Sequence, residues 1–222
     1  MNFKFSFILF FLSSLLFAQQ IEIGPTVGFG FDNIVDRKSD KKRAVIGDAL
    51  GKANYGFSAF FYFNSKQSVI SPRINLFYKF NTRGSKSEIF SDNRFEIDSN
   101  TFGLTGGVAR ALGSGFSLYF DAGFGYIKLK NSGYYKGNEA QTDAFPDLNE
   151  PIDLKTNQVT FIYDFGFDKK ISEQLKVFLE LNGDASISKL NNNRGSYGIQ
   201  SIGFGTGIRY VFNLKKQEIS ED

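Results

Sequence analysis

Apolar and polar residues alternate along several stretches of the chain, most regularly near its C-terminal end. In QSIGFGTGIRYVF, residues 200–212, bulky apolar side chains recur at every second position, with Thr206 as the one gap. The positions between them hold three glycines, a serine, an arginine and a valine. Successive side chains of a β-strand point to opposite faces, so this pattern predicts a strand with one bulky apolar face and one small face.

The same alternation recurs upstream and predicts eight strands in all. Their approximate ranges are 20–32, 54–64, 68–80, 94–111, 116–129, 157–169, 175–186 and 200–212. The range 94–111 is the least regular, because Ile97 falls on the opposite parity to Phe102. We interpret this change as a bulge or a loop extension.

The connections between these strands alternate in length. Short turns, NSKQ, LGSG and KKISEQ, follow the second, fourth and sixth strands. Long polar loops follow the others, near 33–53, 81–93, 130–156 and 187–196. Outer-membrane barrels have short periplasmic turns and longer outer loops. The sequence therefore predicts an all-β fold, an eight-stranded antiparallel up-and-down transmembrane β-barrel, over residues 19–213.

The two faces of the predicted strands decide which solvent each one meets. In a barrel that spans a membrane, the bulky face contacts lipid and the small face lines a narrow lumen. The alternative is a secreted soluble barrel of lipocalin type, with the apolar face inside. Its water-facing side would then be rich in glycine, serine and asparagine with sparse charges, which is poor cover for a soluble surface. We therefore favour the membrane barrel.

Both ends of the chain fall outside the predicted barrel. MNFKFSFILFFLSSLLFAQQ has a basic start, an apolar run and then a small residue, which is typical of a secretory signal peptide over residues 1–18. The alternative, a membrane-anchoring helix, requires a longer apolar run. Residues 214–222 are expected to form a short periplasmic tail. No later segment is apolar enough to span a membrane as a helix, so the chain is expected in the bacterial outer membrane as a multi-strand barrel.

This layout resembles the small outer-membrane β-barrel proteins of diderm bacteria, the OmpA-transmembrane, OmpX and PorT-like group. Gly207, Tyr210 and Phe212 fit the Gly-x-x-aromatic-x-aromatic pattern of the last strand in that family. The resemblance implies that barrel-assembly machinery recognises these three residues as an assembly signal. The chain departs from many relatives in the tail NLKKQEISED, which continues past the aromatic residue.

Composition narrows the chemistry that the chain can perform. It contains 27 Phe and 10 Tyr but no Trp, His or Cys, and its net charge is only +3. The weak charge gives no reason to expect a nucleic-acid partner. Known barrel enzymes of the outer membrane resemble one another in using an active-site histidine as a base, and this chain has none. A Ser–Lys or carboxylate dyad stays open, but we expect no enzyme, cofactor or metal site.

One cluster of charged residues is predicted on the lumen side. Counted from the short-turn end, five residues lie four or five positions up on inward parity: Arg73, Asp121, Asp164, Glu180 and Arg209. Asp121 and Asp164 fall on neighbouring strands, so their carboxylates are expected to face each other. We interpret the five as an ion network that fills the lumen and fixes strand register, since buried charges need partners. The functional alternative is a proton or cation site, or a gate formed by salt bridges.

Two of the long loops differ in charge. The first is basic through Arg37, Lys38, Lys41, Lys42 and Arg43, and it is expected to contact anionic lipopolysaccharide. The third is acidic and carries four apolar residues, Phe145, Leu148, Ile152 and Leu154. Apolar side chains in a polar loop suit a partner protein. The alternatives are that the loops are only solvated or that they pair with each other.

These observations predict a non-enzymatic outer-membrane barrel that acts as a structural or interaction component. It presents long extracellular loops or docks onto a larger outer-membrane complex. The alternative is a small-solute channel or transporter, which a narrow lumen filled with charged side chains disfavours.

Overall fold

The computed structural model describes residues 18–36, 48–63, 69–86, 94–129, 134–136, 157–187, 190–191 and 196–214. Four of the sequence predictions fall largely or wholly outside these residues. They are the signal peptide, the basic residues at 37–43, the apolar residues Phe145, Leu148, Ile152 and Leu154, and the tail after residue 214. Within the described part of the chain, no helix has the length and apolarity needed to cross a membrane.

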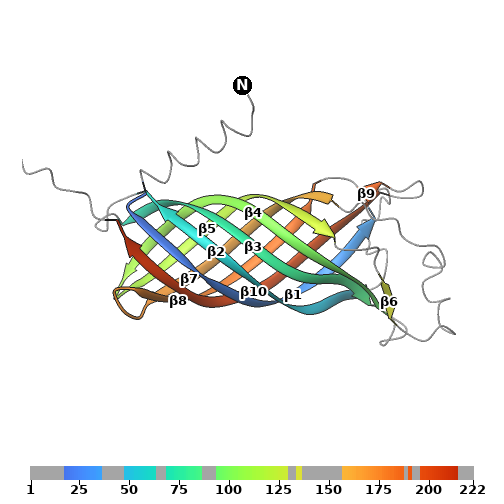
Figure 1. Ribbon diagram of the computed structural model, residues 1–222, viewed down its shortest axis with the longest axis horizontal. Helices are drawn as coiled ribbons and strands as arrows, with labels where there is room; N and C mark the ends of the chain where they lie inside the picture. Colours follow the sequence, from blue (N-terminus) through green and yellow to red (C-terminus); the bar gives the residue numbers. More distant parts are fainter. Residues whose placement is uncertain are drawn as a thin grey trace, which may run out of the picture.

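Eight long strands form a closed antiparallel barrel (Figure 1). They are β1 (Gln20–Asp36), β2 (Asp48–Tyr62), β3 (Ile70–Lys86), β4 (Arg94–Gly113), β5 (Phe116–Leu129), β7 (Asn157–Lys170), β8 (Leu175–Ser186) and β10 (Ser196–Asn213). Each pairs with the next along the chain, and β1 pairs with β10 to close the barrel. The prediction of an all-β, eight-stranded up-and-down barrel is confirmed. Two short strands, β6 (Tyr134–Lys136) and β9 (Leu190–Asn191), were not predicted and pair with β4 and β10.

The strands β1, β2 and β3 reach further towards the long loops than the sequence predicted. β1 continues to Asp36, β2 begins at Asp48 and β3 ends at Lys86. The apolar alternation ends earlier than the strands do, because backbone pairing with a neighbouring strand does not need an apolar face. We call this side of the barrel the loop end and the opposite side, with the short connections, the short-turn end.

Of the two interpretations of the irregularity near Ile97, the bulge is wrong, whereas β4 does extend towards the loop, as far as Arg94. The pairing of β3 with β4 runs in one register from Ile70–Arg110 to Lys86–Arg94. Ile97 is instead an inward residue of an extended strand and is fully buried. The irregularities in register lie elsewhere, between Ala49 and Asn54 in β2 and between Ala111 and Gly113 in β4.

The tight connection between β4 and β5 depends on backbone conformations with positive φ. Gly113, Ser114 and Gly115 have φ angles of 91°, 51° and 78°. Glycine adopts such angles without steric cost, so two of the three strained positions in LGSG carry the residue that suits them.

Bulky apolar side chains face outward along the strands, as the alternation predicted. In β7 every second residue from Gln158 to Asp168 is buried, while the residues between them, such as Phe161 and Phe165, are exposed. The inward positions are occupied by glycines, hydroxyl groups, charged residues and a few large rings. The lipocalin arrangement, with the apolar face inside, is therefore not the one observed.

Candidate functional site

The lumen of the short-turn half contains the five charged residues that the sequence singled out, and all of them are buried. Arg73 on β3 forms a bidentate pair with Asp121 on β5: Nε donates to Oδ1 at 2.9 Å, and Nη2 donates to Oδ2. Its Nη1 donates to the hydroxyl of Tyr62 at 2.9 Å. The two planar groups of a bidentate pair fix each other's orientation, so this contact joins β3 to β5 over the inner face of β4, at Gly107.

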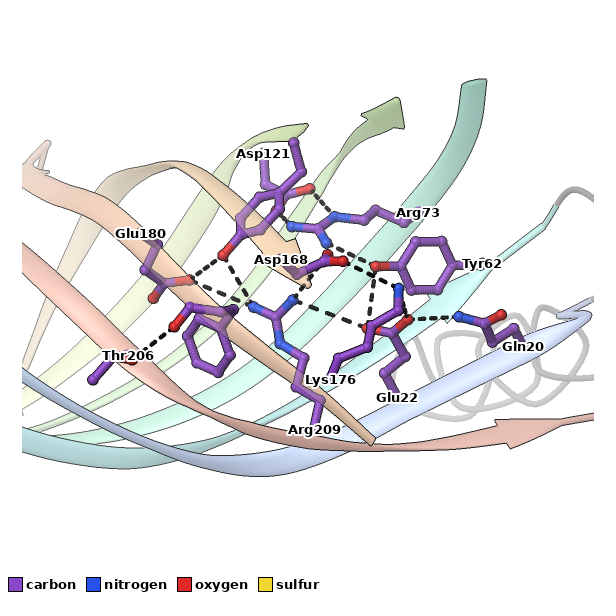
Figure 2. A network of polar contacts seen from close by, with 12 residues as sticks. Gln20, Glu22, Tyr62, Arg73, Asp121, Asp168, Lys176, Glu180, Thr206 and Arg209 are labelled. Atoms are coloured by element: carbon purple, nitrogen blue, oxygen red, sulfur yellow. Dashed lines mark hydrogen bonds and ion pairs between the residues drawn. The ribbon is translucent and has the colours of Figure 1, made fainter. Parts of the chain in front are cut away.

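Arg209 on β10 lies among several anionic groups. Its Nη2 donates to the hydroxyl of Tyr119 at 3.1 Å and lies 3.6 Å from Oε2 of Glu180. Its Nη1 lies 3.8 Å from Oδ2 of Asp168 and 4.0 Å from Oε2 of Glu22. The guanidinium of Arg209 is therefore shared between carboxylates rather than held by one of them (Figure 2).

Aromatic rings separate and sandwich these two guanidinium groups. The ring of Phe60 lies 4.5 Å from the guanidinium carbon of Arg73 and 3.9 Å from that of Arg209. Tyr119 stacks on Arg73 at 3.9 Å, and Phe178 stacks on Arg209 at 3.9 Å. The face of an aromatic ring attracts a cation, and the attraction is stronger when water is excluded. The rings thus stabilise two arginines that would otherwise repel each other.

Asp164 is placed differently from the other four predicted residues. It is the register partner of Asp121 on the neighbouring strand, as expected. Its nearest cation is not an arginine but Lys79, whose Nζ lies 4.0 Å from both Asp164 and Glu180. The structure therefore brings Arg73 to Asp121 and Arg209 to Glu180, and it leaves Asp164 at the edge of the cluster.

Several members of this cluster were missed by the sequence analysis. Lys176 contacts Glu22 at 2.6 Å and Asp168 at 3.4 Å, and the hydroxyl of Tyr62 donates to Glu22 at 3.3 Å. All four residues are on inward parity close to the short-turn end (Figure 2). Treating every inward charged or phenolic residue as a candidate would have found them, because a buried charge must be near a partner.

A second cluster, around Arg83, fills the loop half of the lumen. Nη1 of Arg83 donates to Asp32 at 3.1 Å, and the guanidinium makes two hydrogen bonds to Asp184, at 3.0 and 2.8 Å. The hydroxyls of Ser99 and Thr101 accept further hydrogen bonds from it, at 3.1 and 3.3 Å. The sequence analysis placed Arg83 in a loop, because β3 continues beyond the apolar alternation that defined the predicted strand.

Buried apolar side chains surround the Arg83 cluster. Ile97 pairs in register with Arg83, and Leu50 pairs with Asp32. The inward apolar set of this half is Leu50, Ile97, Ile127, Leu129 and Ile199. The loop half is therefore closed by a combination of one arginine cluster and aliphatic packing.

Two spaces in the lumen are lined by described residues. A cavity of about 20 Å³, lined by residues that include Lys79, Arg83, Asp164 and Asn182, lies between the clusters and has room for about one water molecule. A larger pocket of about 270 Å³, whose lining includes Tyr62 and Lys176, lies at the short-turn end. The barrel is thus hollow at one end and filled through its middle.

The remaining predicted sites concern the last strand and metal chemistry. Gly207 lies in β10 opposite Thr26 of β1, and the outward rings of Tyr210 and Phe212 are 4.7 Å apart. Their role as an assembly signal stays a prediction. In the part of the chain that the structure describes, no three Asp, Glu, His or Cys residues are grouped so that they could hold a metal ion.

No protein-family model and no curated protein matches the chain. Solved structures do match it. The outer membrane protein OprG of Pseudomonas aeruginosa has a TM-score of 0.52 at 12% identity, covering 89% of this chain and 97% of its own. Neisserial surface protein A (NspA) has a TM-score of 0.51 at 8% identity, covering 86% of this chain and 97% of its own. The outer membrane enzyme PagL has a TM-score of 0.42 at 9% identity, covering 82% and 97%, which is too distant to support an inference.

The chain has the fold of the small eight-stranded outer-membrane barrels. The resemblance seen in the sequence is confirmed at the level of the fold. One barrel architecture can host unrelated functions, so the function must be argued from this chain's own surfaces and lumen.

Proposed function

We propose that the protein is an integral barrel of the bacterial outer membrane and acts as a non-enzymatic structural or interaction component. The observation that carries this proposal is a closed barrel with an apolar outer surface and a lumen filled by buried charges and rings. Closure leaves no unpaired strand edge, which hydrocarbon requires.

The height of the apolar surface supports insertion in a bilayer. On the outer face of the β4–β5 pair, Arg110 marks the short-turn side and Lys128 the loop side. Arg110 pairs with Leu118, which is ten residues before Lys128 in β5. Ten strand residues span ~33 Å, and a strand tilt of about 40° reduces this to ~25 Å, the height of the apolar band in outer-membrane barrels.

The filled lumen favours a role other than conduction or catalysis. The described lysines and arginines of the two clusters are held by carboxylates, and bulky rings occupy the space between them. The whole chain also lacks histidine, the side chain best suited to proton transfer near neutral pH. A small-solute channel is the competing function, and it would need a continuous water path through both clusters.

Bilayer recordings separate these two functions. The protein is purified from membranes in detergent and reconstituted in planar bilayers, with a 16-stranded porin as the positive control for detection. We expect no steady ion current from the protein after its insertion is verified. A reproducible unitary conductance would contradict the non-conducting proposal and favour the channel. A protein that stays water-soluble without detergent would contradict the membrane location itself.

The interaction role is assigned to the third long loop, with Phe145, Leu148, Ile152 and Leu154 as the contact residues. Deletion of residues 137–153 should remove proteins that co-purify with the intact chain under mild detergent conditions. Deletion of residues 88–92 from the second long loop is the matched control and should leave them bound. Unchanged co-purification after the 137–153 deletion would remove the basis for the interaction role.

A further inference from the structure

The outward face of the barrel carries two cations at the short-turn end, on strands that are separated by one strand. Arg110 on β4 and Lys169 on β7 both have outward parity, and only β5 lies between these strands. Where side chains are described, the other outward charges on the strands are Asp98 and Lys128, near the loop end. The strands of this face are therefore positive at the short-turn end, where the turn after β7 adds one exposed acidic residue, Glu173.

The two cations are close enough to contact one ligand. Arg110 lies level with Leu118 of β5, and Lys169 lies level with Phe116. Two strand spacings of ~4.8 Å and a two-residue offset of ~7 Å separate their Cα atoms by ~12 Å. Outward side chains on these two strands diverge around the barrel, so the two can contact one phosphate over β5 only where both lean towards that strand.

The state of each side chain favours an external anion. The ammonium of Lys169 lies 3.8 Å from the centre of the ring of Phe116 on β5, so this side chain leans towards β5. Among the described residues, the guanidinium of Arg110 has neither an ion pair nor a hydrogen bond. Arginine presents several donors in one plane and suits a phosphate group.

An apolar surface leads away from these cations towards the middle of the barrel. The exposed residues between and above them are Val108, Leu118, Phe120, Phe165 and Phe167. A ligand with its phosphate at Arg110 and Lys169 therefore has hydrocarbon-compatible surface along the rest of its length. A lipid meets both requirements, whereas a free anion meets only the first.

We propose that the short-turn end of the β4–β5–β7 face binds the phosphate of an anionic phospholipid, with Arg110 and Lys169 as its ligands. This inference rests on the proposed insertion in the outer membrane, where the short-turn end faces the inner, phospholipid leaflet. The two cations mark the lower edge of the ~25 Å apolar band, which is the depth of the lipid headgroups.

Lipid retention tests the proposal. The full chain is reconstituted in vesicles with equal amounts of phosphatidylglycerol and phosphatidylcholine, extracted in mild detergent, and its retained lipids are identified by native mass spectrometry. A cation at the membrane surface contributes ~1 kcal/mol towards anionic lipid, or about fivefold. We expect Arg110→Gln with Lys169→Gln to lower the retained ratio of phosphatidylglycerol to phosphatidylcholine by roughly 10- to 25-fold.

Control variants distinguish a loss of lipid binding at this site from a general loss of charge or a folding defect. Lys128→Gln removes an outward cation of the same strand group at the loop end and should keep the wild-type ratio, whereas an equal loss would overturn the site. Arg110→Lys should retain most of the preference, which guards against a folding defect in the double variant. Wild-type protein that inserts but retains both lipids equally overturns this inference alone, while a failure to insert overturns the proposed function as well. Thermal stabilisation by inorganic phosphate in phosphatidylcholine vesicles would assign the two cations to a free anion and overturn the lipid site.

Discussion

The two halves of the lumen solve the same problem, the burial of charge, in different ways. In the short-turn half, Arg209 contacts several acceptors. The carboxylates around it also have other partners: Lys176 contacts two of them and the hydroxyl of Tyr119 donates to the third. In the loop half, the single guanidinium of Arg83 is the shared partner of Asp32 and Asp184. The first cluster has several cations, whereas the second has one, with Ser201 as a further hydrogen-bond donor to Asp184.

Two glycines of the lumen differ in how closely their surroundings are packed. A Cβ on Gly107, in the short-turn half, would overlap the carbonyl oxygen of Phe120 and the carboxylate of Asp121. A Cβ on Gly30, which lines the small cavity, would meet Asn54 at an ordinary distance of 3.6 Å. The backbone is therefore tightly packed beside the Arg73–Asp121 pair and open beside the small cavity at Gly30.

The largest expected effect comes from removing the central arginine of the loop half. Arg83→Gln leaves the buried Asp32 and the partly exposed Asp184 without a cation, which costs about 3–5 kcal/mol of unfolding free energy. Arg209→Gln should cost roughly half as much, since Glu22, Asp168 and Glu180 retain other contacts. Urea unfolding in lipid vesicles measures both.

A rescue variant tests whether unpaired charge is the cause. Adding Asp184→Asn to Arg83→Gln should recover part of the loss, because it removes one of the two unpaired carboxylates. A larger loss for Arg209→Gln than for Arg83→Gln would show that sharing between several acceptors does not protect a cluster.

The glycines provide the next largest contrast. Gly107→Ala is expected to cost about 1–3 kcal/mol, because the added methyl overlaps backbone and displaces Asp121 from Arg73. Gly30→Ala should change the unfolding free energy by less than ~0.5 kcal/mol, since its methyl enters free space. Equal costs at the two positions would mean that the packing difference between these two glycines has no energetic weight.

The aromatic rings offer a smaller contrast within the short-turn half. Phe60 lies against two guanidinium groups and Phe178 against one. Each buried cation–π contact contributes on the order of 1 kcal/mol. Phe60→Leu should therefore cost about 1 kcal/mol more than Phe178→Leu in the same unfolding assay. Equal losses would show that only the volume of the ring matters.

The strand pattern was predictable because the membrane and the lumen impose opposite demands on alternate residues. Outward Phe120 and inward Asp121 are adjacent in sequence and differ completely in burial, so parity alone assigns them. Strand ends were less predictable, because near Asp36 and Lys86 the backbone remains paired after the apolar signal has stopped. The apparent irregularity at Ile97 was real in the sequence, but it reflects an apolar residue that fills the lumen.

The partners of the inward charges could not be read from the strand pattern. Parity placed Arg73 and Asp121 inside, but the shear of the barrel and side-chain length decide which charges meet. Counting levels from the short-turn end grouped Asp164 with the arginines, whereas the structure gives it Lys79. Because the predicted strand ended before Arg83, the sequence analysis did not place this residue in the lumen. The second cluster was therefore not predicted.

The last contrast concerns conduction, for which we expect no effect at all. Arg73→Gln or Arg209→Gln disturbs only the short-turn half, and the loop half stays closed by Arg83 and its aliphatic neighbours. Planar-bilayer recordings of these variants should therefore be as silent as those of the wild type, although their thermal unfolding in detergent occurs at lower temperature. A folded Arg209→Gln variant with a steady ion current would mean that the short-turn cluster alone controls the path, as a gate of salt bridges does.

Arg83→Gln is the complementary variant. With the short-turn rings in place it should also show no ion current, because both clusters must be disrupted before water can cross the lumen.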